Sequence, residues 1–212
     1  MLRLASLAVL TMTLFLAGCG GAKNPVSEVI FQDAYRLKGA ENMEFHFTKD
    51  SSLYVWHTGI YELGENEDGK PIVRICLDDT KRELPEDYNF TEYLVTEEKG
   101  AVLLTLSTEE FDLESKPMEL YLLNGEHGLL ENSNFDGTYQ IGHDGDSYQY
   151  IFQKDGSIAM QITERYFADK TQMTLIDHAG SANYLYEATD DMLVLKNKDG
   201  EPVLTLLKIT KD

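Results

Sequence analysis

Residues 148–157 read YQYIFQKDGS, and this short stretch indicates the fold class. Its aromatic side chains Tyr148, Tyr150 and Phe152 stand at every second position. A period of two places such residues on one face of a β-strand and the residues between them on the other face. The Asp-Gly pair at 155–156 is typical of a tight hairpin turn, because both residues tolerate positive φ. The stretch therefore predicts a strand that turns back into an antiparallel neighbour.

The same pattern occurs earlier in the chain. Residues 43–48 (MEFHFT) alternate in the same way, and residues 47–53 (FTKDSSL) align with residues 152–158 (FQKDGSI). Two further matches keep the same order: Phe31 and Tyr35 with Phe135 and Tyr139, and residues 116–120 with residues 201–205. Similarity repeated in one order predicts an internal duplication. The alternative is that hairpin-rich proteins reuse the same turn residues.

The duplication divides the chain into a first module at residues 29–124 and a second at residues 132–210. In the first we expect strands near 35–37, 43–48, 52–63, 71–77, 90–96, 101–107 and 117–123. In the second we expect them near 138–142, 148–153, 157–166, 172–177, 182–188, 191–196 and 202–209. Short connections favour antiparallel neighbours. We therefore expect an all-β protein of two tandem antiparallel meander modules, each curled into a small lipocalin-like barrel or curled sheet of six or seven strands.

The N-terminus is typical of an export signal. Residues 1–18 carry one early charge, Arg3, and an apolar run from Leu4 to Leu16 that is too short for a comfortable membrane span. The run ends in LAGC at residues 16–19, which resembles the lipobox of bacterial lipoproteins. This resemblance implies cleavage before Cys19, a lipid on its thiol, and a protein held at the extracytoplasmic face of the cell membrane by a tether at residues 19–28. A plain secretory signal is the alternative.

Composition excludes some partners. The chain has 37 acidic against 18 basic residues and a formal net charge of -19. A nucleic-acid surface needs clustered Lys and Arg, so we expect no nucleic acid. Hydrophobic residues make up 42% of the chain, which fits a globular protein rather than a disordered acidic one. With Cys19 lipidated, no internal disulfide is possible, and Cys76 is expected to pack as a small buried hydrophobe.

Patterns for catalysis and metal binding are missing from the sequence. No Gly-x-Ser-x-Gly elbow occurs, and the pair Asp177-His178 precedes an expected hairpin turn. Zinc needs converging ligands, whereas the histidines are scattered: His46, His57, His127, His143 and His178. The acidic segments 65–68 and 144–146 offer oxygen ligands for calcium but lack the EF-hand spacing, so solvated hairpin tips are favoured. We therefore expect no enzyme, no catalytic residue, no metal and no cofactor.

Five aromatic residues are the candidate ligand-binding residues: Tyr148, Tyr150, Phe152, Tyr184 and Tyr186. On the inner face of a barrel they would line a pocket for a small hydrophobic or sugar ligand. The alternative is plain core packing, since a barrel of about eight strands is just wide enough for side chains to fill it. With fewer strands and bulky aromatic residues inside, a filled core is favoured.

Three motifs of the second module resemble a known family: FDGTY at 135–139, YIFQKDG at 150–156, and Leu193-x-Leu195 before Asp199-Gly200. The module is similar to the short lipocalin-like (calycin-type) domains found in tandem in surface lipoproteins of Gram-positive bacteria. The resemblance implies small β-barrels in the cell envelope.

These observations favour a lipid-anchored, non-enzymatic binding or interaction module. Its partners would be the membrane, through the lipid on Cys19, and a protein or a small hydrophobic ligand. One alternative is a lipocalin-like carrier that holds a hydrophobic ligand inside a barrel. The other is a carboxylate-based hydrolase, which requires two acidic side chains that approach each other in an otherwise apolar setting.

Overall fold

The computed structural model describes residues 28–77, 89–107, 117–125, 136–142, 148–177 and 179–210. Within these ranges the chain forms fourteen β-strands, all paired antiparallel, and no helix, which confirms the predicted all-β fold. The described part of the chain contains no helix with the length and apolar character needed to cross a membrane. The signal segment, Cys19 and most of the tether lie outside the described residues.

The strands fall into two sets of seven in matching order. The first module contributes β1 (Ala34–Leu37), β2 (Ala40–Phe47), β3 (Ser52–Glu65), β4 (Pro71–Cys76), β5 (Thr91–Glu98), β6 (Ala101–Leu106) and β7 (Met118–Gly125). The second contributes β8 (Gly137–Ile141), β9 (Tyr148–Phe152), β10 (Ser157–Ala168), β11 (Gln172–Asp177), β12 (Gly180–Ala188), β13 (Met192–Lys196) and β14 (Pro202–Lys208). Each strand overlaps the range expected from the sequence.

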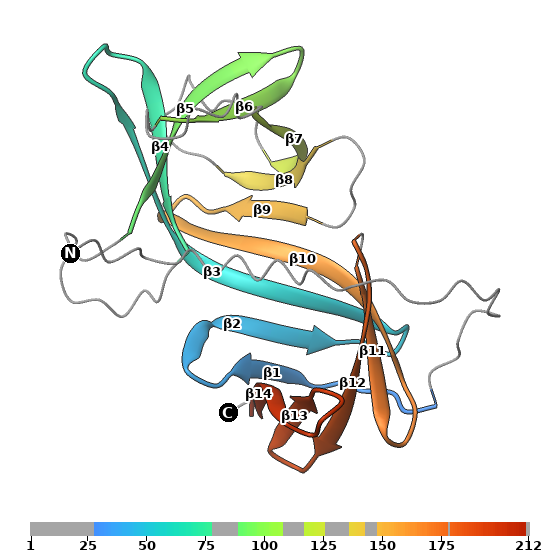
Figure 1. Cartoon of the computed structure of the whole chain (residues 1–212). Helices are drawn as coiled ribbons and strands as arrows, with labels where there is room; N and C mark the ends of the chain where they lie inside the picture. The colour runs from blue at the N-terminus through green and yellow to red at the C-terminus, as the bar shows by residue number, and fades with distance from the viewer. Residues whose placement is uncertain are drawn as a thin grey trace.

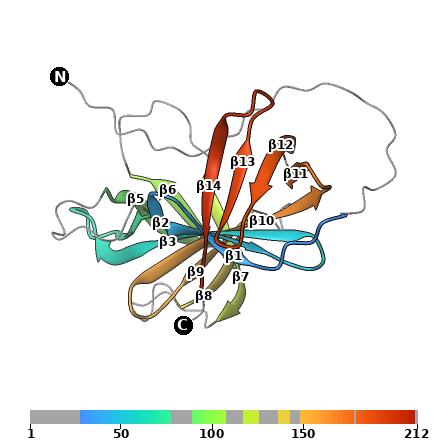
Figure 2. The same cartoon turned by 90° about the horizontal axis from the view of Figure 1, so that it is seen from below.

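The strands close into one ring that is pinched at its middle. Each strand pairs with the next along the chain, and β14 pairs with β1. A further ladder joins β3 to β10 across the ring. It divides the ring into a terminal barrel (β1, β2, β3, β10, β11, β12, β13 and β14) and a central barrel (β3 to β10), each of eight strands. Figure 1 shows β3 and β10 side by side between the two lobes, and Figure 2 shows β1 beside β14.

The two long strands β3 and β10 belong to both barrels. Residues 53–57 of β3 pair with β2 in the terminal barrel, and residues 60–65 pair with β4 in the central barrel. β10 pairs first with β9 and then with β11. At 14 and 12 residues these strands are long enough to serve two barrels each, and they continue without a turn. Each barrel is therefore closed by strands of both modules and has eight strands, where the sequence analysis expected six or seven.

The register of the β3–β10 ladder is symmetric about its middle. A shift of 105 positions, which aligns the two hairpin sequences, also exchanges the two strands of this ladder. The pairs at its middle are symmetric under the shift: Val55–Ile162, Trp56–Gln161 and His57–Met160. The register thus agrees with the duplication inferred from the sequence.

Each barrel has its own hydrophobic core. The core of the terminal barrel consists of Phe31, Tyr35, Phe45, Phe47, Leu53, Val55, Tyr166, Ala168, Met173, Leu175, Ala182, Tyr184, Leu193, Leu195 and Leu206. The core of the central barrel consists of Tyr61, Val73, Ile75, Val95, Val102, Leu104, Leu120, Tyr139, Tyr150, Phe152 and Ile158. Both sets draw on both modules, because the strands are exchanged.

Candidate functional site

The five candidate aromatic residues do not line one pocket. Tyr150 and Phe152 are buried in the core of the central barrel. Tyr184 is buried in the core of the terminal barrel, and Tyr186 packs against that core. Tyr148 is partly buried and pairs with Ile162 close to the point where the barrels meet. The exchange of strands separates these residues into two interiors.

Aromatic rings fill the middle of each barrel. In the central barrel the ring centroid of Phe152 lies 5.1 Å from that of Tyr61 and 5.7 Å from that of Tyr139, both edge-on. In the terminal barrel Phe47 and Tyr166 meet at 5.1 Å, again edge-on. Such edge-to-face contacts are typical of closely packed aromatic cores. The interiors are therefore packed at these levels of the barrels.

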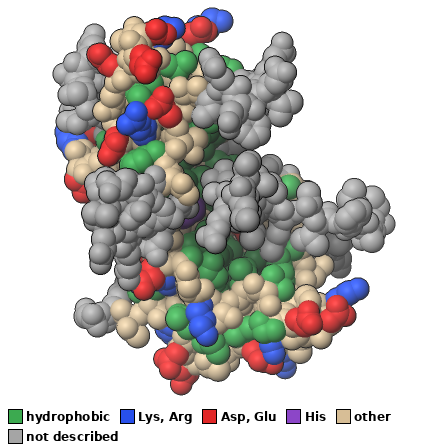
Figure 3. All heavy atoms as spheres, turned by 60° about the vertical axis from the view of Figure 1, so that its left-hand side comes forward, with side chains coloured by type: hydrophobic (Ala, Val, Ile, Leu, Met, Phe, Trp, Pro, Cys, Tyr) green, Lys and Arg blue, Asp and Glu red, His purple; other side chains and the backbone are tan. Residues whose placement is uncertain are grey.

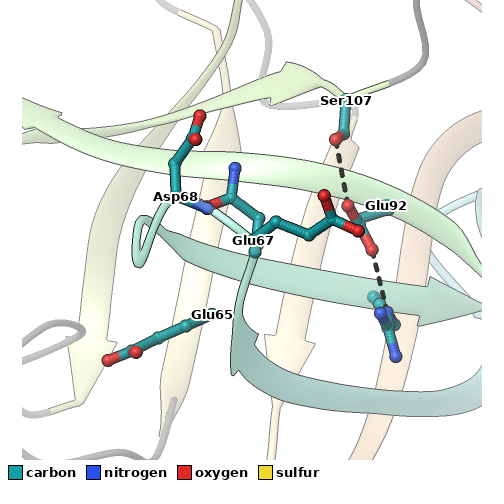
Figure 4. Close-up of a pocket in the computed structure, with 7 residues that line it drawn as sticks. Glu65, Glu67, Asp68, Glu92 and Ser107 are labelled. Atoms are coloured by element: carbon teal, nitrogen blue, oxygen red, sulfur yellow. Dashed lines mark hydrogen bonds and ion pairs between the residues drawn. The ribbon is translucent and has the colours of Figure 1, made fainter.

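A surface hollow of about 480 Å³ lies at the tip of the β3–β4 hairpin. It is lined by Glu65, Asn66, Glu67, Asp68, Arg74, Glu92 and Ser107 (Figure 4). Arg74 Nε donates to Glu92 Oε2 at 2.9 Å, and Ser107 Oγ donates to Glu92 Oε1 at 2.9 Å. These two donors hold the pKa of Glu92 below its ordinary value. Glu92 is thus a fixed carboxylate rather than a proton donor.

The rest of the hollow has the character of a solvated turn. Asn66 Oδ1 accepts hydrogen bonds from the backbone N–H groups of Asp68 and Lys70 at 3.1 and 2.9 Å. Figure 4 shows Glu65 and Asp68 pointing away from Glu92, so not all of the carboxylates converge on one point. Among the described residues, no group of three or more His, Cys, Asp and Glu side chains is placed to hold a metal ion. The hollow therefore offers negative charge but no assembled chemistry.

The second feature is the waist, where each long strand changes its partner. On β3 the residues between the two partner strands are Thr58 and Gly59. Asn42 closes this gap: its Nδ2 donates to Thr58 O at 3.3 Å and to Leu77 O at 2.7 Å. Gly59 packs so tightly that an added Cβ would lie 2.0 Å from Cys76 O. This side of the waist is closed by the side chain of Asn42 and by the tight contact between Gly59 and Cys76.

The opposite side of the waist carries two carboxylates instead. On β10 the residues between the partner strands are Thr163 and Glu164, which the 105-position shift aligns with Thr58 and Gly59. One step beyond the last β10–β11 pair, Arg165–Ile176, the register sets Glu164 opposite Asp177. The same step on the other side sets Gly59 opposite Leu77.

Glu164 and Asp177 both lie at positions of their strands that face the interior of the barrel. Glu164 alternates with Ile162 and Tyr166, which pack in the core of the terminal barrel, and Asp177 continues the phase of Leu175. Burial, and then the negative charge of Asp177, raise the pKa of Glu164 to about 7. The terminal barrel thus has an inward carboxyl group that changes charge near neutral pH.

Two of the predicted aromatic residues lie close to this acid pair. Burial raises the pKa values of Tyr148 and Tyr184, and the charges of Asp177 and Glu164 raise both further. Asp177 is also held by its turn, because its Oδ1 accepts from the N–H groups of Ala179 and Gly180 at 2.7 and 2.8 Å. This turn was predictable from the sequence, whereas the partner of Asp177 across the ladder was not.

Glu164 was missed in the sequence although a signal was present. It is the charged residue in an otherwise apolar inward series from Ile158 to Tyr166. Cys76, by contrast, is fully buried and free, as predicted. The candidates Cys19, His127, His143, His178 and the segment 144–146 lie outside the described residues.

Comparison with protein-family models, with curated proteins and with solved structures gave no match for this chain. Its function therefore has to be inferred from its residues and their geometry.

Proposed function

We propose that this chain is a lipid-anchored, extracytoplasmic and non-enzymatic module that binds a partner protein through the outer surface of its barrels. The observation that carries the proposal is the packing of both interiors. Side chains from both modules fill each barrel, and Leu53, Tyr166 and Leu206 of the terminal barrel are fully buried. A filled barrel leaves its outer surface for recognition.

The surface supports this role in two ways. Figure 3 shows hydrophobic side chains gathered in the hollow between the two lobes, with charged side chains mainly over the outer parts of the lobes. Five large hydrophobic side chains are exposed: Ile30, Leu106, Leu123, Val203 and Leu207. Exposed apolar groups rimmed by polar ones are typical of protein contact sites.

The lipocalin-like resemblance is part of the proposal. Two up-and-down rings of eight antiparallel strands support it, since eight is the strand number of lipocalins. The LAGC sequence at residues 16–19 supports lipidation of Cys19. Replacing Cys19 by serine should release the protein from the membrane fraction of its host, and membrane retention of Cys19→Ser would contradict the anchor.

Site-specific photo-crosslinking in intact host cells tests partner binding. A photoreactive residue would replace Val203 on β14 or Leu123 on β7, which are 47% and 52% exposed. The matched control position is Lys70 in the β3–β4 hairpin. We expect one adduct of defined mass from a barrel position and none from the control. No adduct at either barrel position, or a small molecule bound to the native protein in mass spectrometry, would overturn the proposal in favour of a carrier.

A carboxylate-based hydrolase is the second candidate, favoured by the Glu164–Asp177 pair. A carboxyl group with a pKa of about 7 has the protonation behaviour of a general acid. A panel of glycoside and ester substrates tests this candidate on the purified protein. Any hydrolysis should fall by about 10²-fold or more in Glu164→Gln, which is typical for loss of a general acid. Hydrolysis that survives this substitution would exclude the pair as its source.

A further inference from the structure

The two sides of the waist occupy corresponding positions in the strand register but differ in chemistry. Where one side has Gly59 opposite Leu77, the other has Glu164 opposite Asp177. Among the described residues, no ladder pair is formed on one edge of each long strand at two positions, between the end of one partner strand and the start of the next. On the first side Asn42 spans that interval with its hydrogen bonds.

We propose that Glu164 and Asp177 form a pH-sensitive latch at the waist. With Glu164 protonated, β10 and β11 stay together at this end of the terminal barrel. With Glu164 ionised, two like charges on the inward face push the strands apart and open the barrel beside β9. The latch is a property of the second module, because the first module has no carboxylate at either equivalent position.

Burial and the charge of Asp177 favour the neutral form of Glu164. Asp177 faces it from β11, and Tyr148 and Tyr184 approach it from β9 and β12. Leu53 lies directly opposite on β3, and His57 lies four residues further along the same inward face. On β10 itself the inward neighbours are Ile162 and Tyr166, while Arg165 is exposed on the outer face. The titratable residues His143, Asp144, Asp146 and His178 lie outside the described residues.

The direction of the effect follows from the raised pKa of Glu164. The folded protein holds the proton more tightly than the unfolded chain, whose Glu164 has its ordinary value of 4.5. Stability from this group is therefore complete below pH 4.5, falls as the pH rises to about 7, and falls no further above that. Charge on Glu164 and loosening of the waist increase together over this interval.

Hydrogen exchange of the full chain at pH 5.5 and pH 8, corrected for intrinsic rates, tests the latch. We expect peptides covering β10 and β11 to lose about 30-fold protection at the higher pH, because about 1.5 units of the raised pKa of Glu164 lie between pH 5.5 and pH 7. Peptides covering β3 and β4 are the control within the same chain, and they should not change. An equal loss of protection on the two sides of the waist would overturn the proposal.

Three variants sharpen the test. Glu164→Gln should keep β10 and β11 protected at both pH values, because it keeps the shape and removes the charge. Asp177→Asn should move the midpoint of the change to lower pH, since it removes the like charge but keeps the Oδ1 acceptor of the turn. Glu62→Gln, on the exposed face of β3, is the matched control and should behave as the parent protein. A pH response that persists in Glu164→Gln, or a midpoint unmoved in Asp177→Asn, would refute the latch.

Discussion

Removing the hydroxyl of Tyr166 should cost more stability than removing that of Tyr61, although the two tyrosines are equivalent in the two modules. Tyr166 Oη accepts a hydrogen bond from Phe31 N at 3.0 Å, and it lies 2.9 Å from both Phe31 O and Thr48 O. Tyr61 Oη donates to Gln153 O at 2.8 Å. Thr48 and Gln153 are themselves equivalent under the 105-position shift. Tyr166 thus also contacts both backbone groups of Phe31, and Tyr166→Phe leaves the Phe31 N–H buried without this acceptor.

The expected losses follow from these contacts. A single intramolecular hydrogen bond contributes about 1 kcal/mol net, and a buried donor left unpaired costs about 1–3 kcal/mol more. We expect Tyr61→Phe to lower the free energy of unfolding by about 1 kcal/mol and Tyr166→Phe by about 2–3 kcal/mol. In a protein of this size each kcal/mol lowers Tm by about 2–4 °C. The two variants should then melt about 3 °C and about 7 °C below the parent.

Urea unfolding followed by Trp56 fluorescence and by far-UV circular dichroism measures both losses. Both hydroxyls connect one module to the other, so each variant should shift one common transition of the whole molecule. The double variant should lose the sum of the two within about 0.5 kcal/mol, since the tyrosines lie in different barrels. Equal losses in the two single variants would refute the assignment to Phe31. Separate transitions for the two probes would refute the coupling of the barrels.

Two further predictions use matched positions and thermal unfolding. Gly59→Ala should destabilise by about 3 kcal/mol because its Cβ would meet Cys76 O at 2.0 Å, whereas Gly64→Ala, whose nearest neighbour is a side-chain atom at 3.8 Å, should change stability by less than about 1 kcal/mol; similar losses would contradict the tight waist. Ser51 has φ 66° and its equivalent Gly156 has φ 85°, so Gly156→Ser should lose about 1 kcal/mol while Ser51→Gly loses nothing. A loss in Ser51→Gly as large as in Gly156→Ser would contradict this reasoning.

The strands were predictable from the sequence because alternation and turn chemistry are local. The hairpin after β2 shows this: Thr48 N donates to Ser52 O at 3.0 Å, and its equivalent Gln153 N donates to Ser157 O at 3.0 Å. Both turns were identified from their Lys-Asp-Ser-Ser and Lys-Asp-Gly-Ser sequences. The matching order of the strands in the two modules was also predictable, since the corresponding hairpins carry similar residues 105 positions apart.

The exchange of strands between barrels was not predictable from local pattern. The alternating pattern of a 14-residue segment is the same whether the chain folds back at its middle or continues straight into a second barrel. In β3, Gly59 lies at the point where such a turn could form. Only the pairing of β3 with β10 decides between these outcomes, and the two strands are about 105 residues apart in the chain. The aromatic residues Tyr150 and Tyr184 were therefore assigned to one candidate pocket although they occupy different cores.

The Glu164–Asp177 pair becomes visible when corresponding positions of the two modules are compared. In a duplicated fold, equivalent positions meet equivalent surroundings, so packing alone favours similar residues at both. Leu77 satisfies the inward phase of its strand, whereas Asp177 at the matching position places a carboxylate beside a second one. That arrangement costs stability at neutral pH, because the charged form of Glu164 is disfavoured by burial. A residue that departs from the repeat and lowers stability is better explained by a function than by folding. The Glu164–Asp177 pair at the waist is therefore the first candidate for a functional site in the second module.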